Sequence, residues 1–434
     1  MTPSTKNILL FAVTFGFIPL IAHFQGWNAA LFVLNMGLIS AIMALGVNLQ
    51  WGFAGLFNVG IMGFVALGGL AAVLVSMPAT PGAWDAGGWG LLSAMAMGAA
   101  TVVAVIALRR RMQPGPLRSL AVFAVLAVGF VLYRALFDPA RDAVEDIEPA
   151  LLGYLGGLGL PVIIAWPVGG LLAAGVAWLI GKTALGLRSD YLAIATLGIA
   201  EIILAVLKNE DWLARGVKNV PGLPRPVPFE VDLQNDPAFV ERAAGFGLDA
   251  VVASALYVKL LYTGLFAAVL VALLWMAQCA LKSPWGRMMR AIRDNEVAAE
   301  AMGKDVTRRH LQVFVLGSAI CGIAGAMMTT LDGQLTPGTY QPLRFTFLVW
   351  VMVIVGGSGN NFGAVLGGML IFLMWDQGEI IGLQVMEWIT VGMPEGSALK
   401  AHLIASAAHM RLLTIGVLLL LVLRLSPRGL IPER

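Results

Sequence analysis

SPWGRMMRAIRDNEVAAEAMG, residues 283–303, is the one long charged stretch in a chain that is otherwise mostly apolar. Projected as a helix, with about 100° between successive residues, it gathers its apolar side chains in one stripe opposite its charges. Asn295 is the one polar residue inside the stripe, and Gly303 supplies a helix stop. The pattern therefore predicts one amphipathic helix. Its apolar stripe consists of Met288, Ala291, Ile292, Ala299 and Met302, and its charged face of Arg287, Arg290, Arg293, Asp294, Glu296, Glu300 and Lys304.

The sequence on both sides of this stretch decides the fold class. With 59% apolar and 12% charged residues and a mean hydropathy of +0.84, the 434-residue chain does not resemble a soluble protein, which carries about 25% charged residues. Apolar runs of about 20 residues recur, each enough to cross a membrane. We expect an all-α polytopic membrane protein, a single transmembrane domain over 1–434 with about 10–12 transmembrane helices. The expected spans lie near 8–24, 28–49, 56–77, 88–108, 119–137, 161–181, 190–207, 252–281, 311–330, 343–356, 362–383 and 403–423.

The first of these runs also has the look of a secretory signal peptide, with Lys6 ahead of an apolar segment. The run is long, and no small-x-small cleavage site follows it, so we expect residues 1–25 to be kept as the first span.

Basic residues predict the orientation of the chain. When twelve spans alternate, four basic positions fall on one side, which the positive-inside rule makes cytoplasmic together with both termini. The segment 282–310 is then cytoplasmic, whereas 208–249 is an extracytoplasmic loop whose four prolines exclude a regular helix through 221–228. The four positions are Arg109–Arg111 with Arg118, Lys182 with Arg188, the basic residues of 282–309, and Arg424 with Arg428.

The residue order in GRMMRAIRDNEVAAEAMG (286–303) resembles the cytoplasmic coupling loop of branched-chain amino-acid ABC importer permeases of the LivM type. Composition and periodicity alone would favour a solvated surface helix between two membrane spans, and it is the residue order that points to this family. Four further stretches resemble the same family: LGVNLQWGFAGLFNVGIMGFVALGG (45–69), LGLRSDYLAIATLGIAEI (185–202), VGGSGNNFGAVLGGML (355–370) and LRLSPRGLIP (423–432). Residues 78–180 match no motif, and the fourth and fifth spans are interpreted as an addition.

The resemblance implies a permease subunit of the cytoplasmic (inner) membrane that is not itself an enzyme. Its partners would be a second, LivH-type permease, two ABC ATPase subunits that bind ATP and Mg²⁺, and an extracytoplasmic substrate-binding protein. It would hold no cofactor of its own and move its substrate by alternating access. The 208–249 loop would be either a solvated connector or a docking surface for the binding protein. The ATPase-coupling loop would comprise Arg287, Met288, Ala291, Ile292, Arg293, Asp294, Asn295, Glu296, Ala299, Glu300 and Gly303.

Two of these stretches, 45–69 and 355–370, are rich in glycine and suggest where substrate passes. Non-helical backbone within a membrane is tolerated where it is buried or lines a cavity. Small-residue helix packing is the simpler explanation for any one glycine. Glu201 is central in its span, where a charged side chain costs free energy unless it is paired or hydrated. We therefore expect it to face the path or another subunit. The candidate path residues are Asn48, Gly52, Gly55, Glu201, Gly356, Gly357 and Gly359.

Other charges within spans have simpler explanations. Lys259 and Arg411 would extend toward span ends, and Asp376 and Glu379 would follow a span that ends near Trp375. GVAWLIGKT (175–183) lacks the spacing and the preceding strand of a phosphate-binding loop.

Three other functions stay open. A permease for urea or short amides shares the expected architecture, since a separate binding protein selects the substrate. An ion-coupled secondary transporter would gather carboxylates near discontinuous helices, of which the sequence offers only Glu201. A purely structural membrane protein is the third.

Overall fold

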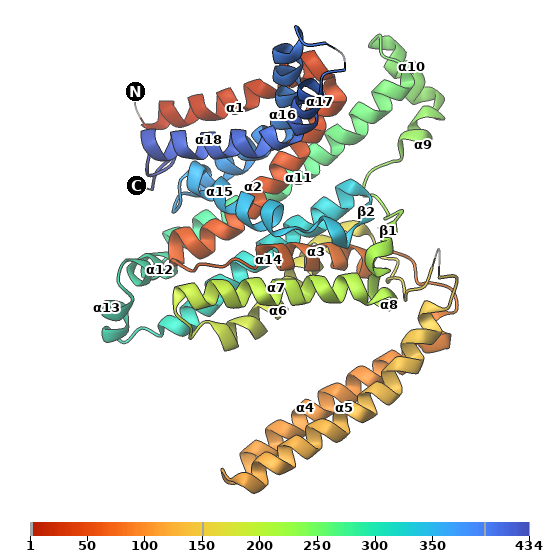
Figure 1. Cartoon of the computed structure of the whole chain (residues 1–434), viewed down its shortest axis with the longest axis vertical. Coiled ribbons are helices and arrows are strands. Elements are labelled where there is room, and N and C mark those ends of the chain that lie inside the picture. Colours follow the sequence, from red (N-terminus) through yellow and green to blue (C-terminus); the bar gives the residue numbers. More distant parts are fainter. Residues whose placement is uncertain (1–2, 150–151, 395, 434) are drawn as a thin grey trace.

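The computed structural model describes residues 3–149, 152–394 and 396–433, and almost all of this chain is helical (Figure 1). Within the described residues, ten helices are long and apolar enough to cross a membrane, and two apolar helices are shorter. The long helices are α1 (Pro3–Gln25), α2 (Trp27–Ala54), α4 (Trp89–Arg111), α5 (Pro116–Glu145), α6 (Val162–Ala184), α7 (Ser189–Asn209), α11 (Ala250–Lys282), α14 (Val306–Asp332), α16 (Asn361–Thr390) and the pair α17 (Ala398–Ala405) and α18 (Met410–Leu425). The two shorter helices are α3 (Ile61–Ser76) and α15 (Leu348–Gly356), the latter preceded by a π-helical turn at Leu343–Phe347.

These helices confirm the all-α polytopic fold class, and each of the twelve expected spans coincides with one of them. The expectation was wrong at residues 56–60, which are not helical. Gly55 ends α2 with a left-handed φ of 68°, and α3 does not begin until Ile61. Asn58 keeps the intervening segment out of the helix, because its side-chain oxygen accepts from the Gly60 amide.

Polar segments gather at the two ends of the helical body. Both termini lie at the same end as α12 (Pro284–Asp294) and α13 (Glu296–Ala301), as Figure 1 shows. The opposite end carries α8 (Asp211–Ala214), α9 (Glu230–Gln234), α10 (Pro237–Gly245) and the antiparallel pair β1 (Val220–Pro221) and β2 (Gln334–Leu335). The structure therefore separates the 282–310 segment from the 208–249 loop.

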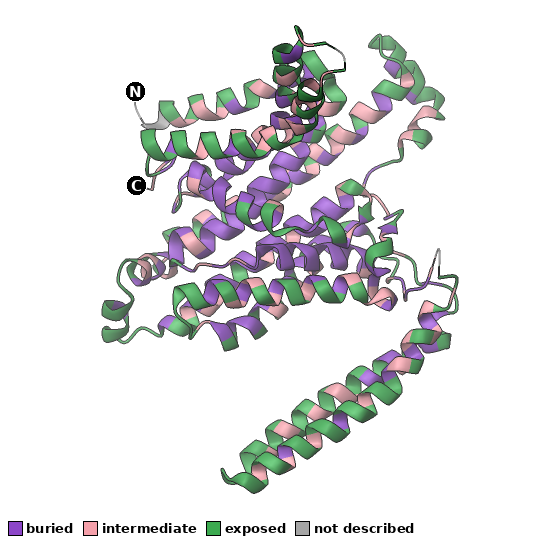
Figure 2. Cartoon of the chain, viewed as in Figure 1, coloured by how far each residue is buried: buried purple, intermediate pink, exposed green. Residues whose placement is uncertain are grey.

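Close helix packing builds the core around α2, α3, α6 and α14. A Cβ on Gly68 of α3 would lie only 1.9 Å from the Gly322 carbonyl oxygen of α14, and one on Gly169 of α6 would lie 3.2 Å from that oxygen. Only glycine permits such an approach at Gly68. Figure 2 shows this centre as buried, with exposed residues on the outer helices.

The helices α4 and α5 form a hairpin that projects from this body (Figure 1). A separate small core joins the base of the hairpin to Trp212, where Phe137 of α5 packs edge-on against the indole. Beyond this base the hairpin exposes large apolar side chains such as Val103 and Phe123, as Figure 2 shows for both helices. Exposed apolar faces on long helices are those that a lipid bilayer covers.

Candidate functional site

The 283–303 stretch forms two helices rather than one. The expectation of one continuous helix was wrong, because α12 ends at Asp294 and α13 begins at Glu296. Asn295 between them has extended backbone (φ −157°), and its side-chain oxygen accepts from the Ala298 amide at 2.9 Å. The polar residue inside the apolar stripe is thus the N-cap of α13. Gly303, at a φ of 75°, follows the end of α13 as expected.

The apolar stripe is divided between an inner and an outer face. Ile292 (1% exposed) and Ala299 (8%) pack within this chain, as does Met289, which the sequence analysis did not single out. Met302 (80%) and Val297 (76%) are exposed, and Val297 too was missed. The outer face of this segment, which includes Val297 and Met302, is therefore left open by the rest of the described chain.

Arg293 joins α12 to two distant parts of the chain. Its Nη1 donates to the Gly52 carbonyl oxygen at the end of α2 and to Glu433 Oε2 at 2.8 Å, near the C-terminus. Its Nε and Nη2 contact Asp294 Oδ1 at 3.1 and 3.0 Å. The guanidinium thus faces its own chain, whereas Asp294 and Glu300 stay exposed. The C-terminal Glu433 was not predicted as part of this site.

The C-terminal segment packs along the second glycine-rich turn. The amides of Leu430 and Ile431 donate to the carbonyl oxygens of Val355 and Gly356, both at 2.9 Å. Asn360, in the turn, donates its side-chain amide to the Pro432 carbonyl oxygen at 3.1 Å. These contacts connect Glu433, and through it Arg293, to the end of α15.

Asn48 of α2 brings the two glycine-rich stretches together. Its Nδ2 donates to Asn361 Oδ1 at 3.0 Å, and its Oδ1 accepts from the Gly359 amide at 2.9 Å. A Cβ on Gly52 would lie 2.3 Å from Asn48 Oδ1, so this turn of α2 requires glycine. The predicted path residues Asn48, Gly52, Gly55, Gly356, Gly357 and Gly359 therefore form one neighbourhood.

An aromatic cluster lines the non-helical segment 55–60. The ring centroids of Trp51, Phe57 and Trp350 lie 4.7 to 5.6 Å apart. Trp350 of α15 donates its indole N–H to the Asn58 carbonyl oxygen at 3.0 Å, and Asn58 in turn donates to Gln50 Oε1 at 2.9 Å. Sequence reasoning missed these aromatic residues, because nothing local marks them as neighbours.

The two shorter helices begin beside one another. The Met62 amide, in the first turn of α3, donates to Thr346 Oγ1 just before α15, at 3.3 Å. Each helix follows non-helical backbone, 55–60 before α3 and 340–341 before the turn leading into α15. Broken helices that begin within the body of a membrane protein are how many transporters form substrate sites.

A small cavity of about 160 Å³ lies between segment 55–60 and α12. Its lining includes Gly55 and Phe57 from one side and Ile292, Arg293 and Glu296 from the other. The helices α12 and α13 thus lie directly against the segment that precedes α3.

Glu201 does not join this neighbourhood. It is exposed on the outer face of α7, whereas Thr196 faces inward and accepts from the Val59 amide through its Oγ1 at 3.1 Å. Five residues along a helix turn a side chain through about 140°. Glu201 therefore lies apart from the other candidate path residues, on a face that the described chain leaves open.

Two other charges within helices have partners in the structure. Arg411 of α18 pairs with Glu379 of α16 and lies 5.2 Å from the Trp375 ring centroid. Lys259 donates to the Asn28 carbonyl oxygen at 2.9 Å, in the first turn of α2. The helix α16 itself continues past Trp375 to Thr390.

A family model described as "Branched-chain amino acid transport system / permease component" matches residues 119–423, from the start of α5 almost to the end of α18. The match includes the fifth expected span and leaves out the glycine-rich stretch at 45–69.

Individual relatives are similar over shorter regions. The high-affinity branched-chain amino acid transport system permease protein LivM of Escherichia coli K12 is 30% identical over 230 residues, 51% of this chain and 52% of that protein. The probable branched-chain amino acid transport permease protein LivM of Methanocaldococcus jannaschii is 30% identical over 154 residues, 36% of this chain and 41% of that protein. The fructose import permease protein FrcC of Rhizobium meliloti is 28% identical over 106 residues, 24% of this chain and 29% of that protein. The chain thus spans about half the length of the first of these relatives, and no solved structure matches it.

Proposed function

Because the chain belongs to the family of branched-chain amino acid transport system permease components, we propose that it is a membrane-spanning subunit of an ABC importer for branched-chain amino acids. The family match over 119–423 carries this proposal. It is supported by multi-pass architecture, with ten long apolar helices in the described residues, and by relatives named LivM. The chain is thus a permease component of the inner membrane rather than a catalytic subunit.

Each proposed partner carries out one part of the transport cycle. A second, LivH-type permease completes the membrane part, two ABC ATPase subunits bind ATP and Mg²⁺, and a binding protein delivers substrate to the end that carries 208–249. The end with α12 and α13 is then cytoplasmic, together with both termini. A probable LivH permease of Methanocaldococcus jannaschii is itself 30% identical to this chain over 90 residues, which supports a paired arrangement of related permeases.

The proposed coupling step begins at the outer face of α12 and α13. ATP-driven closure of the ATPase dimer pulls this segment, and Arg293 transmits the motion to Gly52 at the end of α2. From there the 55–60 segment and the starts of α3 and α15 rearrange, since Gly55 and Phe57 line the small cavity beside α12 and hydrogen bonds join Asn58 to Trp350 and Met62 to Thr346. Alternating access at this point would expose the substrate first to one side of the membrane and then to the other.

Reconstitution tests the proposed function directly. The full chain is co-expressed with its candidate partners, purified in mild detergent and placed in liposomes with external binding protein. We expect recovery of a second permease and two ATPases, and uptake of leucine, isoleucine or valine that requires ATP. Leucine uptake by the chain alone without ATP would contradict the proposal in favour of ion coupling, and ATP-dependent uptake of urea alone would contradict the substrate class.

The double variant Val297→Asp with Met302→Asp tests the docking surface. Both side chains are largely exposed, so the chain should fold, but charged groups replace the apolar contacts proposed for the ATPase. Burial of one such side chain is worth about 1.5–3 kcal/mol, so we expect at least about a hundredfold weaker ATPase binding in a pull-down titration.

Val217→Asp is the matched control, because Val217 is similarly exposed (67%) but lies in the 208–249 loop at the opposite end. Ile292→Asp is expected to impair folding instead, since Ile292 is buried in this chain. Unchanged ATPase binding by the double variant would show that the docking surface lies elsewhere.

A further inference from the structure

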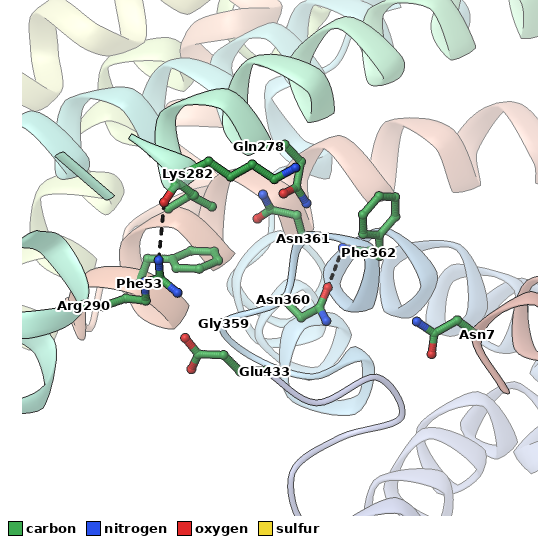
Figure 3. Close-up of a pocket in the computed structure, with 11 residues that line it drawn as sticks. Asn7, Phe53, Gln278, Lys282, Arg290, Gly359, Asn360, Asn361, Phe362 and Glu433 are labelled. Atoms are coloured by element: carbon green, nitrogen blue, oxygen red, sulfur yellow. Dashed lines mark hydrogen bonds between the residues drawn. The ribbon is translucent and has the colours of Figure 1, made fainter. Parts of the chain in front are cut away.

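A cavity of about 500 Å³ opens at the end of the molecule that carries both termini (Figure 3). It lies between the first turns of α1, the last turn of α11 and the start of α16. Its polar lining includes Asn7, Gln278, Lys282, Arg290 and Asn361, and none of these residues lines the smaller cavity beside segment 55–60. It borders the candidate path at Gly359 but is a different cavity from the one beside segment 55–60.

Hydrogen-bond donors without acceptors face this cavity. Within the described residues, Lys282 has no side-chain hydrogen bond or ion pair, and the only polar contact of the Arg290 side chain is with the Leu281 carbonyl oxygen, at 3.5 Å. The Arg290–Asp294 spacing would allow an ion pair, but Asp294 pairs with Arg293. Two cations thus line the cavity without a carboxylate partner.

A buried amide adds a third donor. Asn361 is only 1% exposed, and its Oδ1 is occupied by Asn48. Its Nδ2 has no hydrogen-bond partner, although the residue lines the cavity. Leaving a buried donor unpaired is costly, which indicates that a bound acceptor completes the site.

The one carboxylate in the lining does not neutralise these donors. Glu433 Oε2 accepts from Arg293 at 2.8 Å, so its charge is already balanced. In Figure 3 the Lys282 side chain extends toward Gln278 and Asn361, whereas Glu433 lies across the cavity from it. The Lys282 side of the cavity therefore suits an anion.

The position of the cavity indicates which kind of anion it binds. Asn7 and Lys282 stand at the polar ends of the apolar helices α1 and α11. Next to them, Ile8 (67% exposed) and Phe362 (47%) leave apolar surface open toward the surrounding bilayer. We propose that the cavity binds the phosphate of an anionic phospholipid headgroup through Lys282, Arg290 and Asn361, with the acyl chains along α1 and α16. Basic pockets between membrane helices are the usual form of such sites.

Binding of short-chain phosphatidylglycerol to the delipidated full chain in detergent tests this assignment. Each lost cation should weaken binding about fivefold, so we expect this loss for Lys282→Gln and for Arg290→Gln, and a larger loss for the double variant. Asn361→Asp keeps the acceptor for Asn48 but replaces the unpaired donor with a negative charge, and should also weaken binding. Arg424→Gln is the matched control, since Arg424 is exposed at the same end of the molecule but does not line the cavity.

The same titration with short-chain phosphatidylcholine and with inorganic phosphate separates the ligands. Much weaker binding of both supports a site for an anionic lipid. Equal affinity for phosphatidylcholine would overturn the proposal, and inorganic phosphate bound as tightly as the lipid would overturn the lipid as its source. Losses in the Lys282 and Arg290 variants no larger than that of Arg424→Gln would also overturn it.

Discussion

Replacing Arg293 by alanine is expected to abolish transport while leaving the ATPase subunits bound. The side chain joins α12 to the Gly52 carbonyl oxygen and to Glu433, and none of these contacts belongs to the exposed docking surface. Hydrogen bonds to a charged group contribute about 1.5–3 kcal/mol each. Losing two of them should lower the equilibrium constant for contact between α12 and the end of α2 by about a hundredfold or more. The expected signature is ATP hydrolysis without substrate uptake, measured side by side in liposomes.

Two neighbouring variants make this expectation specific. Asp294→Ala removes a carboxylate that is 66% exposed and only contacts Arg293, so transport should stay near the wild-type rate. Glu433→Gln keeps an acceptor for Arg293 without the charge and should give an intermediate rate. Wild-type uptake by Arg293→Ala, or loss of the ATPases from that variant, would contradict a transmitting role for this side chain.

Much of the architecture was predictable because membrane spans are determined locally. An apolar run of sufficient length crosses the bilayer wherever it occurs, and each of the twelve expected spans coincides with a helix. The helix stop at Gly303 and the proline-rich, non-helical part of the 208–249 loop were predictable for the same reason. Hydropathy also separated the basic end of the molecule from the opposite one.

The site was less predictable because its contacts join distant parts of the chain. Trp350 and Asn58 are 292 residues apart, and Arg293 and Glu433 are 140 apart. Periodicity placed Ile292 on an apolar face but could not show that this face packs against the chain's own core. Hydropathy likewise extended the third span through 56–60, since it does not register that Asn58 bonds to Gly60 and Trp350.

Glu201 of α7 is the second residue whose substitution we expect to have a large effect, in this case on assembly. The surface around it has room for a helix of another subunit to pack. Gly198 and Ala205 lie three residues before and four after it, on the same exposed face. A Cβ on Gly198 would meet no atom within 4 Å, so the surface beside the carboxylate is open. Small residues on both sides of a polar one allow close approach and a hydrogen bond across a helix pair in a membrane. We propose that the second permease packs here and supplies a donor to Glu201.

Glu201→Leu separates this proposal from simple exposure to lipid. A charged group at the centre of a bilayer costs about 2.5–3.5 kcal/mol, so the leucine variant should be at least as stable as the wild type when the chain is purified alone. If a partner helix donates to the carboxylate, the same variant loses that contact and leaves a donor unpaired, and recovery of the second permease should fall by about tenfold. Glu201→Gln, which keeps an acceptor, should recover most of the complex. Full assembly and transport by Glu201→Leu would instead mean that the face of α7 around Glu201 meets only lipid, and the carboxylate would then have no role in the complex.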